Sequence, residues 1–171
     1  MEIGLLVIQA FVGLTLVAHG MQHALGLLGG GGVSGTGAWF ESMGIRHGRL
    51  MAAAAGGTEL MAGALFAVGL LTPFAAAGIA ATMLVAAATD HGGKGFWIYN
   101  GGKEYVLTIA TIAIGVAFNG AGEWSIDAAL GLGLSGVPWG LGAAGAAAAG
   151  AVTVLGLFRE RPVLSANARA A

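Results

Sequence analysis

The sequence predicts an all-α protein, a polytopic bundle of five transmembrane helices. Of its 171 residues, 57% are hydrophobic and only 9% are charged, which is too few charges to cover a soluble domain. The apolar residues form long segments, and in hydrocarbon a helix satisfies its own backbone hydrogen bonds. Turns rich in glycine and proline separate these segments. The chain is therefore expected to lie in a lipid bilayer.

The segments follow from apolar length, taken in order along the chain. They cover residues 3–23, 50–71, 74–89, 105–118 and 138–158. The third and fourth are shorter than the roughly 20 residues that a span needs, so neighbouring loop residues must extend them. Turns are predicted at 29–32, 71–73, 92–93 and 133–138. Residues 38–43 mix aromatic and polar side chains, which predicts a short interfacial helix before the second span.

Charge gives the expected orientation. When five spans are threaded, all seven basic residues fall on one face of the membrane: Arg46, Arg49, Lys94, Lys103, Arg159, Arg161 and Arg169. The positive-inside rule then places the C-terminus in the cytoplasm and the N-terminus outside, across an inner or plasma membrane. The net charge of −1 excludes a nucleic-acid binder. The absence of cysteine excludes disulfides, thiolate nucleophiles and cysteine-ligated clusters.

Glu59 is the strongest candidate for chemistry. It lies nine residues inside the second span, roughly 15 Å from the cytoplasmic end and near mid-membrane. An acid at that depth costs about 2.5 to 3.5 kcal/mol, so it needs a partner, a proton or a wet cavity. One interpretation is a carboxylate that exchanges protons or bonds a quinone headgroup. The other is a neutral acid that bonds a neighbouring helix through Thr58, Gln9 or Thr15.

The histidines are the second set of candidates. His19 and His23 are four residues apart, which places them on one helical face near the cytoplasmic boundary. They are interpreted as a proton relay or, alternatively, as interfacial residues bonded to backbone or lipid. Without an HExxH motif or further acids nearby, no metal site is predicted. Pairing of His19 with His91 leaves a bis-histidine haem b open.

The start of the fourth span adds Glu104, for which capping of the helix dipole is a sufficient explanation. A further hypothesis joins His19, His91 and Glu104 into a polar cytoplasmic mouth. This mouth would lead to Glu59 through a cavity among the first, second and fourth spans. On the outer side, Asp127 is expected in an interfacial helix with Ser125 as its N-cap.

Short motifs recur along residues 1–131: His19-Gly20-Met21-Gln22-His23, residues 57–63, 69–73 and 102–105, His91, and residues 125–131. In their order and spacing they resemble the DoxX family of small bacterial membrane proteins. The resemblance implies a four-helix membrane domain over 1–131, to which residues 132–171 add a fifth helix and a cytoplasmic tail. Family members are associated with redox assemblies, including a thiosulfate:quinone oxidoreductase and a mycobacterial oxidoreductase complex.

The leading hypothesis is therefore a subunit of a respiratory or oxidative-stress redox complex; whether it is itself an enzyme stays open. Glu59 and His19 are the candidate catalytic residues. The candidates for contact with a quinone or another cofactor are His19, His23, Glu59, His91 and Glu104. Rival hypotheses are a non-catalytic scaffold subunit and a proton-coupled transporter, although no inverted repeat supports the transporter.

The fifth span is dense in small residues, which favour close helix packing. They are Gly140, Gly142, Gly145, Ala146, Ala149 and Gly150. This helix is expected to pack within the bundle or to dock on other subunits of a membrane complex. Docking is preferred because the helix lies outside the four-helix resemblance.

Overall fold

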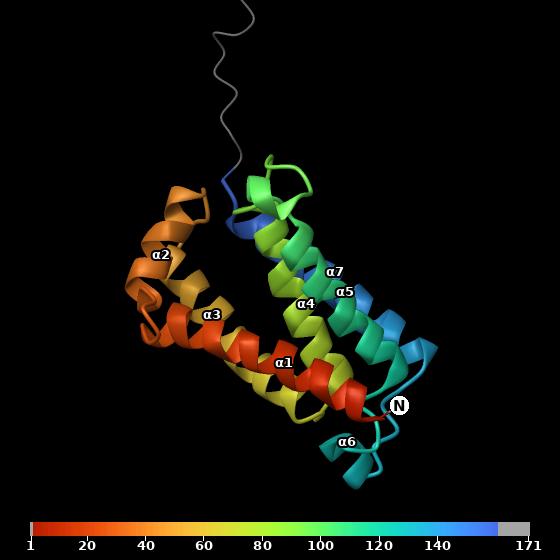
Figure 1. Cartoon of the computed structure of the whole chain (residues 1–171). Helices are drawn as coiled ribbons and strands as arrows, with labels where there is room; N and C mark the ends of the chain where they lie inside the picture. The colour runs from red at the N-terminus through yellow and green to blue at the C-terminus, as the bar shows by residue number, and fades with distance from the viewer. Residues whose placement is uncertain (1, 161–171) are drawn as a thin grey trace, which may run out of the picture.

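A computed structural model describes residues 2–160, and this part of the chain is helical apart from its connections and one isolated β-bridge (Figure 1). The all-α prediction is confirmed. Arg161 and Arg169, which the orientation argument also uses, lie outside the described residues. The elements are α1 (Glu2–Gly20), the π-helical turn η1 (Met21–Leu25), α2 (Gly32–Ser42), α3 (Gly48–Ala67), α4 (Thr72–Ala88), the 3-10 turn η2 (Ile98–Asn100), α5 (Glu104–Asn119), α6 (Ile126–Ala129) and α7 (Val137–Phe158).

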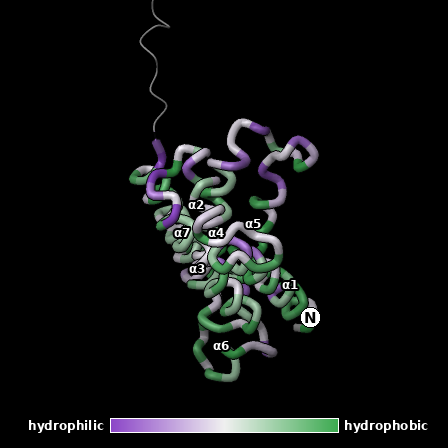
Figure 2. The backbone as a smooth tube through the Cα atoms, turned by 90° about the vertical axis from the view of Figure 1, so that its left-hand side faces the viewer, coloured by the Kyte–Doolittle hydropathy of each residue, from purple (hydrophilic) through white to green (hydrophobic). Residues whose placement is uncertain are grey.

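Five of these helices correspond to the predicted spans. The segment Ile3–Leu25, which is α1 with η1, and helices α3 and α7 are long and apolar enough to cross a membrane, with 23, 20 and 22 residues. Helices α4 and α5 are apolar but have 17 and 16 residues. The sequence had predicted that the third and fourth spans are the short ones. Most hydrophilic stretches lie at the end that holds the α4–α5 loop and the end of α7 (Figure 2).

Helix α4 lies at the centre of the bundle. It packs against α3 on one side and against α5 and α7 on the other, while α1 packs mainly on α3 (Figure 1). The largest fully buried apolar side chains are Phe66, Leu16 and Ile79. Much of the remaining core is alanine, and such small side chains let helices approach closely in a membrane.

Glycines fix how α1 and η1 lie on α3. A Cβ atom added to Gly13 would lie 2.5 Å from the carbonyl oxygen of Gly63. One added to Gly20 would lie 2.6 Å from Leu60 Cγ, and one added to Gly56 would lie 2.8 Å from Ala24 Cβ. The backbones are thus in direct contact along this seam. The seam sets the register that brings η1 level with the middle of α3.

Helix α2 differs from the prediction. The sequence analysis predicted a turn at 29–32 and an interfacial helix over 38–43, but the helix starts at Gly32 and packs along the first half of α3. The chain turns between Gly26 and Gly32, which have φ values of 70° and 58°. Gly37 is buried, and a Cβ atom there would lie 2.8 Å from the backbone nitrogen of Arg49. This close approach explains why α2 lies against α3.

The other end of the bundle is held by Asp127. The predicted N-cap is present, because Ser125 Oγ accepts a hydrogen bond from Ala128 N at 3.1 Å. The buried Asp127 carboxylate accepts from the backbone nitrogens of Leu71 at 2.7 Å and Thr72 at 3.0 Å. These donors belong to the first turn of α4, where Leu71 has a φ of 49°. Asp127 therefore accepts hydrogen bonds from N–H groups that have no partner within α4, and it has a structural role.

Replacing Asp127 with alanine is expected to destabilise the protein by about 1–3 kcal/mol, because two buried N–H groups lose their acceptor. Thermal unfolding in detergent measures this. The Asp127→Asn variant keeps one acceptor oxygen, so its unfolding temperature is expected to lie between those of wild type and Asp127→Ala. If Asp127→Ala unfolds at the wild-type temperature, the contact contributes nothing.

Candidate functional site

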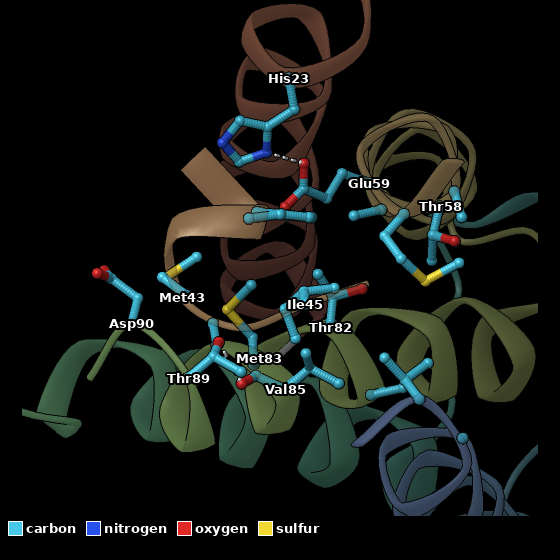
Figure 3. Close-up of a pocket in the computed structure, with 18 of the residues that line it drawn as sticks. His23, Met43, Ile45, Thr58, Glu59, Thr82, Met83, Val85, Thr89 and Asp90 are labelled. Carbon is cyan, nitrogen blue, oxygen red and sulfur yellow. Dashed lines mark hydrogen bonds and ion pairs between the residues drawn. The ribbon is translucent and has the colours of Figure 1, made fainter. Parts of the chain in front are cut away.

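The centre of the site is a buried pair formed by His23 and Glu59. Beyond Gly20 the helix widens into one π-helical turn, a feature often found at functional sites, and it ends at Gly26. His23 Nδ1 lies 2.7 Å from Glu59 Oε2 (Figure 3). Glu59 is 4% exposed, whereas His23 is half-buried. One proton occupies this contact, on either the imidazole or the carboxyl group, so the pair can hold and pass on a proton.

The pair lies at the wall of a pocket of about 210 Å³. The pocket is lined by residues of η1, α2, α3, α4 and α7 and of the connections next to them (Figure 3). Its apolar lining includes Trp39, Phe40, Met43, Ile45, Met51, Met83, Val85, Gly150 and Val154, and its polar lining is His23, Thr58, Glu59, Thr82, Thr89 and Asp90. A water molecule takes about 30 Å³, and an apolar cavity of about 150 Å³ holds benzene. The pocket is thus large enough for one substituted six-membered ring.

The polar groups on the α4 side differ from the His23–Glu59 pair. The hydroxyls of Thr82 and Thr89 donate to the carbonyl oxygens of Gly78 and Val85 in their own helix, at 3.0 and 2.9 Å. Toward the pocket these hydroxyl oxygens can therefore only accept hydrogen bonds. Asp90 lies 3.5 Å from Lys94 Nζ at the end of α4. Figure 3 shows Asp90, Thr82 and Thr89 across the pocket from Glu59.

The structure brings three of the predicted site residues together. The rings of His19 and His23 are 5.9 Å apart between centroids, so His19, His23 and Glu59 form one row. The sequence analysis had offered Gln9, Thr15 or Thr58 as partners of a neutral Glu59. Thr15 instead donates to Phe11 O in its own helix. The partner found for Glu59 is His23, which sequence depth alone had placed near the membrane boundary.

His91 and Glu104 lie elsewhere. His91 Nδ1 is 2.7 Å from Gly101 O, and Glu104 Oε2 accepts from Ile98 N at 2.9 Å. Both side chains hold the α4–α5 loop together, and neither lines the pocket. The predicted mouth among the first, second and fourth spans is wrong in its position. The pocket lies next to α2, α4 and α7, and no residue of α5 lines it.

A haem held by His19 and His91 does not fit this arrangement. Both nitrogens of His91 already face oxygen atoms, since Nε2 lies 3.6 Å from Asp90 Oδ2 and Nδ1 contacts the Gly101 carbonyl. His19 lies against His23. Among residues 2–160, no group of three His, Asp or Glu side chains is arranged to hold a metal ion. His19 and His91 therefore do not form a bis-histidine haem site.

Sequence reasoning missed the walls of the pocket. Trp39 and Phe40 line it from α2, Met43 lines it from the residue after α2, and Asp90 lines it from the connection after α4. A signal was present in α2, because residues 39, 40 and 43 share one face of a helix. That signal needed α2 to be recognised as a packed helix. Gly150 and Val154, which line the pocket from α7, had no comparable signal in the sequence around them.

The family assignment rests on helices α1 to α4. The DoxX family model matches residues 4–92, just over half of the chain. The chain belongs to the DoxX family. Comparison with curated proteins and with solved structures gave no significant match. In this DoxX protein the matched region runs from α1 to the end of α4, and it supplies both members of the His23–Glu59 pair.

Proposed function

We propose that this DoxX protein is a membrane subunit of a redox assembly and that its pocket binds the headgroup of a membrane quinone. The observation that carries the proposal is the buried His23–Glu59 pair at the wall of a ring-sized apolar pocket. Ligand pockets typically combine an apolar lining with a few polar groups that fix orientation. A buried ionisable residue in a membrane-spanning helix is energetically costly, so it marks a candidate functional site.

The residues of the pocket have distinct roles in this proposal. A bound quinone supplies two-electron chemistry coupled to two protons. Glu59 and His23 bond a headgroup oxygen and hold one proton at their shared contact. His19, with its ring 5.9 Å from that of His23, accepts or returns this proton as the next group in the row. Trp39 and Phe40 exclude water from the headgroup.

The exposed face of α7 suits contact with a partner subunit. Gly140, Ala143, Ala147 and Ala151 are buried in the bundle, where α7 packs on α4 and α5. The small residues Gly142, Gly145, Ala146 and Ala149 are exposed, and this spacing suits close packing of another transmembrane helix. The same face favours a scaffold role as the second candidate function. The pocket beside Glu59 favours ligand binding over scaffolding alone.

We further propose the inner-membrane orientation with the N-terminus outside. The described basic residues Arg46, Arg49, Lys94, Lys103 and Arg159 belong to connections and helix ends at one end of the bundle, which supports it (Figure 1). The division into a four-helix unit over 1–131 and an added helix over 132–171 stays a prediction.

Orientation is tested by labelling single cysteines, since the chain has none of its own. Ser135 and Ser42 are both exposed, at opposite ends of the bundle. A membrane-impermeant maleimide is expected to label Ser135→Cys in intact cells and Ser42→Cys only after the membrane is opened. The reverse pattern would contradict the proposed orientation.

Quinone binding is tested with Trp39 as the reporter. Of the four tryptophans, Trp39 lines the pocket, and the other three, Trp97, Trp124 and Trp139, are replaced by phenylalanine. A decyl-benzoquinone is titrated into the protein in lipid nanodiscs. We expect saturable quenching of Trp39 fluorescence. A matched variant that keeps only Trp97, exposed in the α4–α5 loop, reports quinone dissolved in the lipid. Identical, unsaturable quenching of both variants would refute the proposal.

A further inference from the structure

We infer that α7 is a wall of this pocket and that Val154 and Gly150 set the size of the ligand that it admits, restricting it to single-ring headgroups. The inference rests on the proposed function for the chemistry of the ligand. It goes beyond that function because α7 lies outside the region that the family model matches. Part of the candidate site is thus supplied by a segment that the family match does not cover.

Val154 and Gly150 reach the pocket from the buried side of α7. Both line it, and they are one helical turn apart. A Cβ atom added to Gly150 would lie 3.5 Å from Ala81 Cβ, which is ordinary contact with a residue that also lines the pocket. A larger side chain at either position would therefore enter space that the pocket now holds open.

The residues at the end of α7 also hold a second part of the pocket wall, the connection between α2 and α3, in place. Arg46 N donates to Phe158 O at 2.7 Å, and Glu160 N donates to Gly44 O at 2.7 Å. These bonds form a β-bridge around Ile45, which is 4% exposed and lines the pocket. Helix α7 thereby contributes two lining residues directly and fixes the connection between α2 and α3. The pocket has its present size because α7 is docked.

The volume argues for a single ring. A cavity of about 150 Å³ holds benzene, so about 210 Å³ accommodates one ring with small substituents. A fused two-ring headgroup needs more room at the α7 wall. Overpacking a fitted site weakens binding by about fivefold to a hundredfold.

The first test measures the pocket without a quinone. Thr82→Cys serves as the reporter in the cysteine-free chain, and its reaction with a small neutral methanethiosulfonate is timed. Adding Val154→Phe is expected to slow this reaction by about tenfold, the effect of overpacking the pocket. The matched control is Val152→Phe, two residues away and 70% exposed, which should leave the rate unchanged. Equal rates in the two variants would overturn the inference.

A second pair of variants tests the same inference in case Val154→Phe does not fold. Gly150→Leu is expected to slow the same reaction, whereas Gly145→Leu should not, because nothing lies within 4 Å of a Cβ atom at Gly145. If Gly150→Leu reacts as fast as Gly145→Leu, the inference is wrong on this pair as well.

The second test uses quinones. Binding of a decyl-benzoquinone and of a decyl-naphthoquinone is measured by Trp39 quenching in nanodiscs. Wild type is expected to favour the single ring by about tenfold, and Val154→Ala to reduce that preference. If neither quinone binds but Val154→Phe still slows cysteine labelling, the proposed function fails and α7 remains the wall. If wild type binds both quinones equally well, the size restriction is overturned while the proposed function stands.

Discussion

Replacing Glu59 with glutamine is expected to weaken quinone binding by about ten- to a hundredfold. Glutamine keeps the size of the side chain but cannot take up or release a proton as a carboxyl group does. A hydrogen bond that involves a charged group contributes about 1.5–3 kcal/mol, which corresponds to that loss of affinity. The measurement is the quenching of Trp39, which lines the pocket together with Glu59.

The matched control is Glu104→Gln. Glu104 was also a candidate from the sequence, but its carboxylate accepts from Ile98 N in the α4–α5 loop and does not line the pocket. We expect this variant to bind the quinone as wild type does. Equal affinities in Glu59→Gln and wild type would show that the His23–Glu59 pair does not contact the ligand.

Gly56→Val is expected to abolish binding and to lower stability, by about 1–3 kcal/mol. A Cβ atom at Gly56 would lie 2.8 Å from both the Cβ and the backbone nitrogen of Ala24. The valine side chain therefore pushes η1 away from α3. Because Ala24 is adjacent to His23, the bond between His23 and Glu59 is lost with it. Thermal unfolding in detergent and Trp39 quenching measure the two effects.

The neighbouring Gly57→Val is the control, because nothing lies within 4 Å of a Cβ atom at Gly57. It carries the same loss of helix-interior glycine and the same new side chain. We expect it to unfold near the wild-type temperature and to bind quinone. If Gly56→Val and Gly57→Val behave alike, close packing of η1 on α3 does not position His23.

The sequence was sufficient to predict the long apolar helices. Apolar length identified all five, and it even singled out the short pair that became α4 and α5. The same signal failed for α2, because residues 29–32 read as a turn and concealed a helix that starts at Gly32. In α2 the glycines both make the turn and let the helix approach α3, and only the packed structure separates these two uses.

The chemistry was predicted in part. The energetic cost of a buried acid identified Glu59, and the four-residue spacing identified the His19 and His23 row. Their contact was not predicted, because the register of α1 on α3 depends on backbone contacts such as that of Gly13 with Gly63. His91 and Glu104 were predicted to belong to the site only because of their expected depth in the membrane. Their hydrogen bonds lie within the α4–α5 loop instead.

The pocket itself was beyond sequence reasoning. Its lining runs from His23 to Val154 and combines residues from separate helices. No spacing along one helix records that Val154 of α7 approaches the same space as Met43 next to α2. Such a site appears only when the helices are packed together.

Photoaffinity labelling tests the central claim most directly. The protein in nanodiscs is illuminated with an azido-benzoquinone, and the labelled peptides are identified by mass spectrometry. We predict labels within residues 39–45, 51–59, 81–90 and 150–154, which line the pocket together with His23, competed by unlabelled quinone and reduced in Glu59→Gln. Labels on lipid-facing residues such as Phe11 or Leu141, unaffected by competitor, would contradict the account.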